Sequence, residues 1–311
     1  MKILITGGTG YFGKSIISFL IKNNFDLEHI YILSRNPISL NKYFDLESLP
    51  FKVSLIKHDI TKPIDFDQSV DFVIHAATTV GLDNPIEIEK VIIDGTKNIL
   101  KYIKNRNIKR LLYISSGAVY GKQSSGIKKI SENYSCKKEL RTVYGNAKYE
   151  AEKLCELYKE KFELDYVIGR GFAFVGPYLP LNQHFAIGNF INNCLRNEDI
   201  IIKGDGRTVR SYMFSDDLVF WLFKILFNGK SGEAYNIGSD LPITIYDLAK
   251  TCKEVAGSKS KIIFENSANN KTIDYYLPDV SKAKKMLNLE VSFDLFESIN
   301  KTISFHKNNQ L

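Results

Sequence analysis

The strongest constraint on how this chain folds is a glycine-rich turn near its start. An apolar run over Lys2–Thr6 leads into Gly7–Gly13, which reads GGTGYFG, and a helical pattern over Tyr11–Asn23 follows. Glycine at this spacing permits a tight turn, a close approach of the backbone to a pyrophosphate, and close packing of the helix on the strand. The helix N-terminus adds N–H groups and the positive end of its dipole. The segment therefore predicts a strand–turn–helix unit that binds a dinucleotide through Gly7, Gly10, Tyr11, Phe12 and Gly13.

The first half of the chain continues this alternation of short β-branched runs and longer helical patterns. Helices are predicted over Ile86–Lys104 and Tyr144–Lys161. Such alternation is typical of a parallel sheet with helices on both faces, and the near-continuous apolar run Leu111–Ile114 fits a strand buried on both faces. The fold class is therefore α/β, with a Rossmann-type doubly wound parallel sheet. Further strands are predicted over Ile30–Leu33, Val53–Lys57, Phe72–His75, Leu111–Ser115 and Tyr166–Gly169.

The pattern loosens after Gly176-Pro177, which indicates a second, smaller α/β domain. We predict a Rossmann domain over 1–175, which receives a segment returning from the second half, and a substrate domain over 176–311. The polar tail from His306 is expected to be frayed. Helices are predicted over Phe185–Asn197, Asp216–Phe227, Thr244–Val255 and Val280–Leu287, and strands over Ile200–Lys203, Ser211–Phe214 and Tyr235–Gly238.

The composition is that of a soluble globular protein, with 44% hydrophobic and 25% charged residues among 311. No stretch approaches the roughly 20 apolar residues of a membrane span, so we expect a cytoplasmic protein with no membrane partner. The net charge of +7 comes from lysines and arginines spread along the chain, which suits a small anionic ligand better than nucleic acid. The four cysteines form no C-x-x-C pair, so no metal site is expected.

The end of the second predicted strand reads Ser34-Arg35-Asn36 and carries no acidic residue. An acid at this position holds the adenosine ribose hydroxyls of NAD, whereas an arginine there accommodates the 2′-phosphate of NADP. A guanidinium pairs well with phosphate. Ser34 and Arg35 therefore favour NADP(H), with NAD as the alternative if Arg35 is a solvated loop residue.

Tyr144 and Lys148 lie four residues apart at the start of a predicted helix and so project from the same face. A phenol with an unperturbed pKa near ~10 transfers protons poorly at neutral pH unless its anion is stabilised, which a neighbouring ammonium achieves. Ser115 ends the predicted strand over Leu111–Ser115 and Ser116 follows it, at the edge where open parallel sheets bind ligands. Either serine alone could merely cap the strand end. Together the residues predict a catalytic set of Ser116, Tyr144 and Lys148.

These motifs together resemble the extended short-chain dehydrogenase/reductases, in the nucleotide-sugar branch of the NAD-dependent epimerase/dehydratase family. The resemblance includes the segment Arg170–Pro177 and runs over essentially the whole chain. It implies a small-molecule nucleotide-sugar substrate. Many relatives carry Asn where this chain has Ala173, and Asn189 or His184 is the candidate replacement. By the same resemblance, the cofactor contacts include Asp59, Ile60, Ala76, Ala77, Thr78, Tyr144 and Lys148, and the substrate contacts include Ser116, Gly117, Ala118 and Arg210.

Three reactions are known in the family that this chain resembles. Dehydration uses an acid pair after the catalytic Ser/Thr, where this chain has Gly117 and Ala118, so dehydration is disfavoured. Arg35 favours an NADPH-dependent reductase of a 4-keto-6-deoxyhexose nucleotide, of the kind that serves surface polysaccharide synthesis. An NAD-dependent 4-epimerase is the alternative, and a non-catalytic NADP sensor ranks below both. The helices over Ile86–Lys104 and Tyr144–Lys161 carry apolar residues that serve either the core or a homodimer interface.

Overall fold

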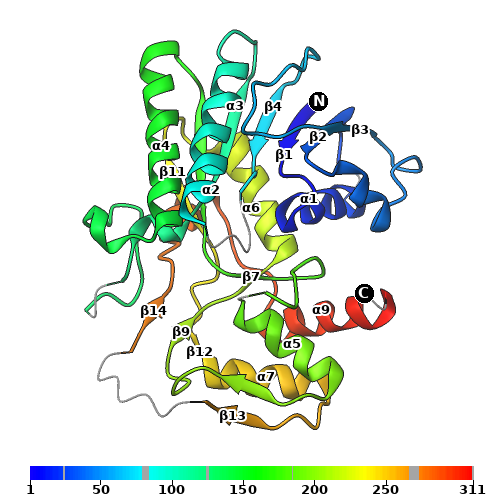
Figure 1. Ribbon diagram of the computed structural model, residues 1–311, viewed down its shortest axis with the longest axis vertical. Helices are drawn as coiled ribbons and strands as arrows, with labels where there is room; N and C mark the ends of the chain where they lie inside the picture. The colour runs from blue at the N-terminus through cyan, green and yellow to red at the C-terminus, as the bar shows by residue number, and fades with distance from the viewer. Residues whose placement is uncertain (24, 79–83, 124–125, 184, 266–272, 310–311) are drawn as a thin grey trace. The chain divides into compact units, whose positions relative to one another are not determined.

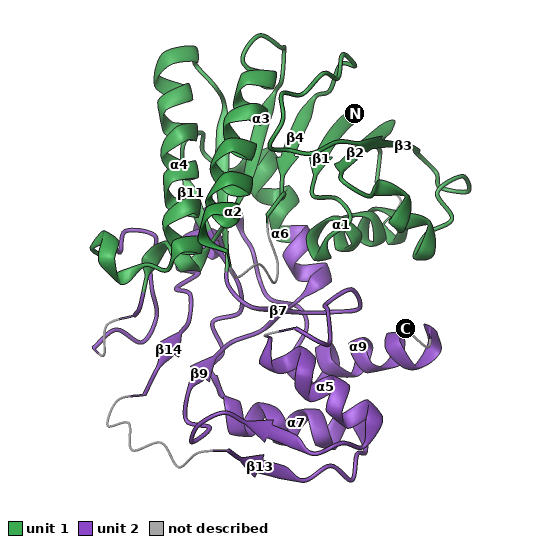
Figure 2. Ribbon diagram, viewed as in Figure 1, with its two compact units in different colours: residues 1–121, 135–171, 221–235 green, residues 122–134, 172–220, 236–311 purple. Residues whose placement is uncertain are grey.

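The computed structural model describes residues 1–23, 25–78, 84–123, 126–183, 185–265 and 273–309. The chain divides into two compact units, coloured separately in Figure 2. The first unit comprises residues 1–121, 135–171 and 221–235, and the second comprises 122–134, 172–220 and 236–311. Both units are discontinuous, whereas the sequence suggested one boundary after residue 175. Residues 221–235 return to the first unit from the second half of the chain.

A seven-stranded sheet in the order β11-β6-β5-β4-β1-β2-β3 organises the first unit (Figure 1). The successive pairs from β6 to β3 are parallel, which confirms the predicted Rossmann-type sheet. Because Thr6 pairs with His75 and His75 with Tyr113, the carboxyl ends of β1, β4 and β5 lie next to one another. The strands are β1 (Lys2–Thr6), β2 (His29–Ser34), β3 (Lys52–Lys57), β4 (Phe72–His75), β5 (Arg110–Ser116), β6 (Tyr166–Gly171) and β11 (Ala234–Ile237).

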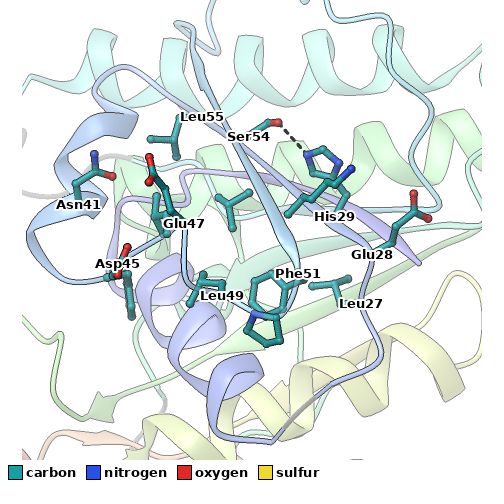
Figure 3. Close-up of a pocket in the computed structure, with 15 residues that line it drawn as sticks. Leu27, Glu28, His29, Asn41, Asp45, Glu47, Leu49, Phe51, Ser54 and Leu55 are labelled. Carbon is teal, nitrogen blue, oxygen red and sulfur yellow. Dashed lines mark hydrogen bonds between the residues drawn. The ribbon is translucent and has the colours of Figure 1, made fainter.

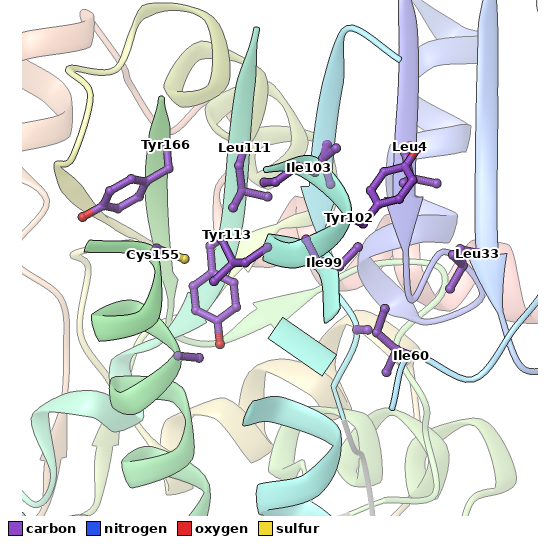
Figure 4. Close-up of a cluster of buried hydrophobic side chains, with 14 of the residues drawn as sticks. Leu4, Leu33, Ile60, Ile99, Tyr102, Ile103, Leu111, Tyr113, Cys155 and Tyr166 are labelled. Carbon is purple, nitrogen blue, oxygen red and sulfur yellow. The ribbon is translucent and has the colours of Figure 1, made fainter. Parts of the chain in front are cut away.

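Helices cover both faces of this sheet, and alternate strand residues pack on each. On one face, Leu4, Leu111 and Tyr113 belong to a buried cluster that α3 (Gly95–Ile103) and α4 (Val143–Phe162) complete, as Figure 4 shows. The other face carries α1 (Tyr11–Lys22) and the second half of α6 (Ser215–Asn228). There the ring of Phe72 lies 5.3 Å from that of Phe227.

The helix predicted over Ile86–Lys104 is interrupted in the structure. It begins as α2 (Pro85–Glu89), passes through a π-helical turn over Lys90–Asp94, and continues as α3. Asn84 caps its start by accepting a hydrogen bond from the Ile86 N–H. A π turn inserts a residue into the helical repeat and re-aims the side chains that follow it. Thr96 thereby reaches the buried His75 ring, at 3.1 Å from Nε2.

Small sheets and helices build the second unit. Of the strand predicted over Ser211–Phe214, the structure forms only the last two residues, as β10 (Met213–Phe214), and a separate strand, β9 (Val209–Arg210), precedes it. The strands are β7 (Phe174–Val175), β8 (Ile200–Ile202), β9 (Val209–Arg210), β10 (Met213–Phe214), β12 (Ile243–Thr244), β13 (Ile262–Phe264) and β14 (Tyr275–Tyr276). They pair as β10-β7, β12-β9-β14 and β13-β8. The helices are α5 (Ala186–Arg196), α7 (Ile245–Ala256), α8 (Ser281–Leu287), α9 (Leu295–Asn309) and the first half of α6.

The expectation of a frayed tail from His306 was wrong, because α9 runs on to Asn309. Ile299 and Ile303 are four residues apart and fully buried, so they anchor one face of this helix. The hydroxyl of Thr302 donates to the Ser298 carbonyl and is satisfied within the helix. Among the residues described, no helix is both long and apolar enough to cross a membrane.

Candidate active site

The glycine turn adopts the backbone that its sequence predicts. Gly7 has φ +69°, and a Cβ there would lie 2.7 Å from the Ala77 Cα. A Cβ on Gly13 would overlap the Gly8 backbone. Gly10 is the N-cap of α1 and supplies no capping side chain to the first-turn amides. Among the described residues, a Cβ on Gly10 would approach only the Gly7 oxygen, at 3.3 Å. A helix start with an uncapped N-cap beside open space fits the phosphates of a dinucleotide.

The end of β2 presents Ser34 and Arg35 at the same edge. The Ser34 hydroxyl lies 2.8 Å from the Thr9 hydroxyl, which ties the glycine turn to this strand. Arg35 is exposed. Asp59 accepts a hydrogen bond from the Thr61 N–H, and this bond, with a contribution from the Arg35 charge, lowers the pKa of Asp59. The neighbouring Ile60 is buried, and its carbonyl accepts a hydrogen bond from Asn98.

The segment after β4 passes close beside the glycine turn. Ala76 and Ala77 are buried, and the Ala77 N–H donates to the Thr6 hydroxyl at 3.3 Å. The buried Thr78 hydroxyl interacts with the Tyr144 phenol and opposes the rise in its pKa. The Thr78 side chain therefore lies at the same edge of the sheet as Tyr144.

Ser116, Tyr144 and Lys148 come together through the start of α4. Thr142 caps this helix by accepting from the Gly145 N–H at 3.0 Å. A Cβ on Gly145 would overlap the carbonyl oxygen of Ala118, so glycine here lets the first turn of α4 approach the segment after Ser116. Burial raises the pKa of Tyr144, while the Thr78 and Ser116 hydroxyls oppose this rise.

Lys148 is a fully buried side chain, with 2% of its surface exposed. Its Nζ donates to the Ile114 carbonyl at 2.8 Å and lies 5.9 Å from the centre of the Tyr144 ring. Burial lowers the pKa of Lys148 to about 7, and the Glu152 carboxylate opposes that fall. The ammonium therefore loses its proton close to physiological pH instead of remaining a permanent cation.

His75 lies under the same edge, between two threonine hydroxyls. Its Nδ1 is 2.6 Å from Thr6 Oγ1 and its Nε2 is 3.1 Å from Thr96 Oγ1. Burial, followed by the charge of Lys148, lowers the pKa of His75 to about 3. The imidazole is therefore neutral at physiological pH and serves to hold β1, β4 and α3 together.

The neutral His75 predicts an acid-sensitive stability. The unfolded chain binds a proton near pH 6.5, whereas the folded chain does so only near pH 3, so stability falls as the pH drops below 6.5. The expected loss from this residue is about 2 kcal/mol between pH 6.5 and 5. Urea unfolding at several pH values measures it. His75→Gln, whose amide still reaches hydroxyls, should flatten the slope by that amount, and an unchanged slope would contradict the assignment.

Glu152 and Arg170 border this site and were not among the predicted site residues. Arg170 forms two hydrogen bonds to the Glu152 carboxylate, at 3.0 and 2.7 Å, and both side chains are largely buried. The spacing Tyr-x-x-x-Lys-x-x-x-Glu puts Glu152 on the same helix face as the pair before it, so the sequence held a signal for it. Arg170 lies on β6, and no local spacing connects it to Glu152.

The predicted substrate residues divide between the units. Ser116, Gly117 and Ala118 belong to the first unit, whereas Asn189 on α5 and Arg210 on β9 belong to the second. Gly117 is buried and Ala118 is half-buried. Asn189 is half-buried in the first turn of α5.

Arg210 already has an acidic partner in the structure. Its guanidinium contacts the Asp274 carboxylate at 2.8 Å and lies 5.7 Å from the centre of the Tyr276 ring. Asp274 is 64 residues further along the chain, so no local pattern predicted this contact. His184, the other candidate for a substrate contact, lies outside the described residues.

A large hollow in the first unit is a separate feature of the fold. Its volume is about 1150 Å³, and it lies between the edge strand β3 and the loop over residues 43–51 (Figure 3). His29 and Ser54 are hydrogen-bonded within its wall at 2.8 Å. None of the predicted cofactor, catalytic or substrate residues lines it. The chemistry is therefore assigned to the carboxyl edge of the sheet and not to this hollow.

Comparison with known proteins identifies the family. The chain is 29% identical to a protein named putative UDP-glucose 4-epimerase from Methanocaldococcus jannaschii, over 99% of each chain. It is 30% identical to UDP-glucuronic acid decarboxylase 1 of Arabidopsis thaliana, over 100% of this chain and 71% of the relative. The structure of UDP-glucuronic acid 4-epimerase from Bacillus cereus, in complex with UDP-glucuronic acid and NAD, matches with a TM-score of 0.83 at 25% identity over 99% of each chain.

The model of the NAD dependent epimerase/dehydratase family matches residues 3–238. That range includes the glycine turn, Ser116, and the pair Tyr144 and Lys148. The match covers well over half of the chain and includes the predicted site residues, so it establishes the family relationship. The chain belongs to the NAD-dependent epimerase/dehydratase family.

Proposed function

We propose that this protein is an NADP(H)-dependent oxidoreductase that reduces the 4-keto group of a nucleotide-linked 4-keto-6-deoxyhexose. The observation that carries this proposal is the convergence of Ser116, Tyr144 and Lys148 in one unit with the glycine turn. The carboxyl ends of β1, β4 and β5 are neighbours in the sheet, so a bound dinucleotide reaches the catalytic side chains.

The side chains divide the work of carbonyl reduction among them. When bound, the reduced nicotinamide cofactor would supply a hydride, that is, one proton with two electrons, to the carbonyl carbon. Ser116 donates a hydrogen bond to the carbonyl oxygen, and Tyr144 gives its proton to that oxygen as negative charge develops on it. The Lys148 ammonium stabilises the phenolate that remains, which then recovers a proton from solvent. The net change is ketone to alcohol, with oxidation of the cofactor and uptake of one proton.

The residues around Ser116 support reduction over dehydration. Elimination of water needs an acid and a base beside the sugar, and Gly117 and Ala118 provide neither. Recognition of the nucleotide diphosphate is assigned to Arg210, which would exchange the partly exposed Asp274 carboxylate for a phosphate.

The cofactor assignment predicts a selective effect at Arg35. Arg35→Ala should weaken NADPH binding by roughly 10- to 100-fold, because a charge-assisted contact to phosphate contributes about 1.5–3 kcal/mol. Binding of NADH, which lacks that phosphate, should change little. Calorimetric titration of both dinucleotides measures the ratio, with the exposed Arg196→Ala as the control. Equal losses for the two cofactors would overturn the preference for NADP(H).

A redox-neutral 4-epimerase is the second candidate. Its support is the relative from Methanocaldococcus jannaschii, named as a putative 4-epimerase, and the NAD in the Bacillus cereus complex. An epimerase oxidises and then re-reduces the same carbon, so it uses the same tyrosine and lysine without net consumption of cofactor.

One assay separates the two candidates. The protein is incubated with NADPH and a 4-keto-6-deoxyhexose linked to dTDP, CDP or UDP, and separately with NAD and the corresponding UDP-hexoses. Stoichiometric oxidation of NADPH with formation of the alcohol supports the reductase. Interconversion of two hexose isomers without net change in NAD absorbance supports the epimerase and overturns the reductase.

A further inference from the structure

A buried polar network connects the catalytic helix to the strand ends beside Ser116. Glu152 accepts a hydrogen bond from the Ser115 hydroxyl at 2.5 Å, and Arg170 holds both of its carboxylate oxygens. Arg170 also donates to the Tyr120 hydroxyl at 2.9 Å. The network therefore joins α4 to β5, β6 and the short helix over Gly117–Tyr120.

Glu152 lies one helical turn beyond Lys148 on the same face of α4. Its own surface is 5% exposed, so water screens its charge poorly. The Ser115 and Arg170 hydrogen bonds hold the carboxylate in one place, with no freedom to turn towards solvent. A fixed negative charge in a dry environment acts strongly on a neighbouring ammonium.

The other described groups that face Lys148 do not supply such a charge. His75 on β4 is neutral, since its pKa is lowered to about 3. Tyr113 on β5, whose ring centre lies 5.0 Å from Nζ, has its pKa raised by burial and is protonated. Tyr144 on α4 is also protonated at rest, because burial raises its pKa. Of the carboxylates that the structure describes, Glu152 is the one that acts on the pKa of Lys148.

We propose that Glu152 is a positioning residue that acts through Lys148, and that its clamped carboxylate favours the charged form of the buried lysine during turnover. Arg170 has the opposite influence, because its guanidinium neutralises part of the same carboxylate. The catalytic importance of the Lys148 charge rests on the function proposed above. The charge state of Lys148 can be measured on the free protein.

The test follows the titration of Lys148 without substrate or cofactor. The full chain is labelled with [ε-13C]lysine, the Lys148 resonance is identified by its absence in Lys148→Met, and its chemical shift is followed against pH. Glu152→Gln should lower the titration midpoint by about one pH unit or more. Arg170→Gln should raise it, because the carboxylate loses its partner. Glu156→Gln, an exposed site one turn further along α4, should leave it unchanged.

The midpoint of Lys148 is expected to shift in opposite directions in the two variants, and this difference separates an electrostatic effect from damage to the fold. Both buried variants break the same ion pair, so a purely structural role would move the midpoint in the same direction in both, or in neither, and either result overturns the proposal. If Glu152→Gln does not fold, the double variant Glu152→Met with Arg170→Met removes both charges and leaves an apolar pair. Its midpoint should still fall, because the Glu152 charge acts on the pKa of Lys148 whereas Arg170 is not among the groups that shift it directly, and an unchanged midpoint overturns the proposal.

The titration also keeps this inference apart from the proposed reaction. A protein that turns over no nucleotide sugar but shows the opposite shifts would overturn the proposed function and support the role of Glu152. If turnover is found, the high-pH limit of kcat should move down in Glu152→Gln along with the Lys148 midpoint.

Discussion

Replacing Tyr144 with Phe should lower kcat for the nucleotide-sugar substrate by roughly 10²- to 10⁴-fold, the usual contribution of a general acid. The change removes one hydroxyl, and the proton that it carries is the one needed by the developing alkoxide. Fold and dinucleotide affinity should stay close to those of the parent, because the ring remains and the turn over Gly7–Gly13 is untouched. Steady-state kinetics with whichever substrate class proves active, together with calorimetric titration of the dinucleotide, measures both quantities.

The matched control for this variant is Tyr149→Phe on the same helix. The centre of the Tyr149 ring lies 3.9 Å from the Arg141 guanidinium, so this contact is made through the ring face, which Phe retains. The control should therefore keep near-normal turnover. Near-normal turnover in Tyr144→Phe would remove Tyr144 from the reaction, whichever net reaction the protein catalyses.

Gly13→Ala should destabilise the fold by about 3 kcal/mol and abolish dinucleotide binding, because small-to-large changes in closely packed sites force backbone shifts. The added Cβ would overlap the Gly8 backbone, so α1 and the glycine turn cannot both stay in place. The atoms that the new Cβ would meet are backbone atoms, which cannot move aside as a flexible side chain can. Urea unfolding measures the free energy of unfolding, and calorimetric titration measures binding.

Two other glycines separate folding from binding in this experiment. A Cβ on Gly126 would meet no atom of the described residues within 4 Å, so Gly126→Ala should change neither quantity. Gly10→Ala meets only the Gly7 oxygen, at 3.3 Å, so the protein should fold while its methyl group occupies the space expected for phosphate. Normal dinucleotide binding by Gly10→Ala would contradict the placement of the pyrophosphate at this helix start.

Local patterns predicted the sheet well because its inner strands are buried, although the edge strand β3 is only half-buried. The β1 and β4 boundaries agree with the predicted ranges, and β2, β3, β5 and β6 extend them by one or two residues. A parallel strand that is buried on both faces has a nearly continuous run of β-branched residues, so its own sequence predicts it. By contrast, α9 was missed because Ser298 and Thr302 are polar residues on its buried face.

By itself, the sequence determined the strand–turn–helix unit, the α/β class, and the approach of Tyr144 to Lys148, because these depend on neighbours along the chain. The tertiary structure alone decided what surrounds those residues. The pairing of Glu152 with Arg170 and of Arg210 with Asp274 joins residues distant in sequence, on elements whose approach no local spacing encodes. The low pKa of Lys148 has the same origin, since burial depends on every strand and helix that packs over the side chain.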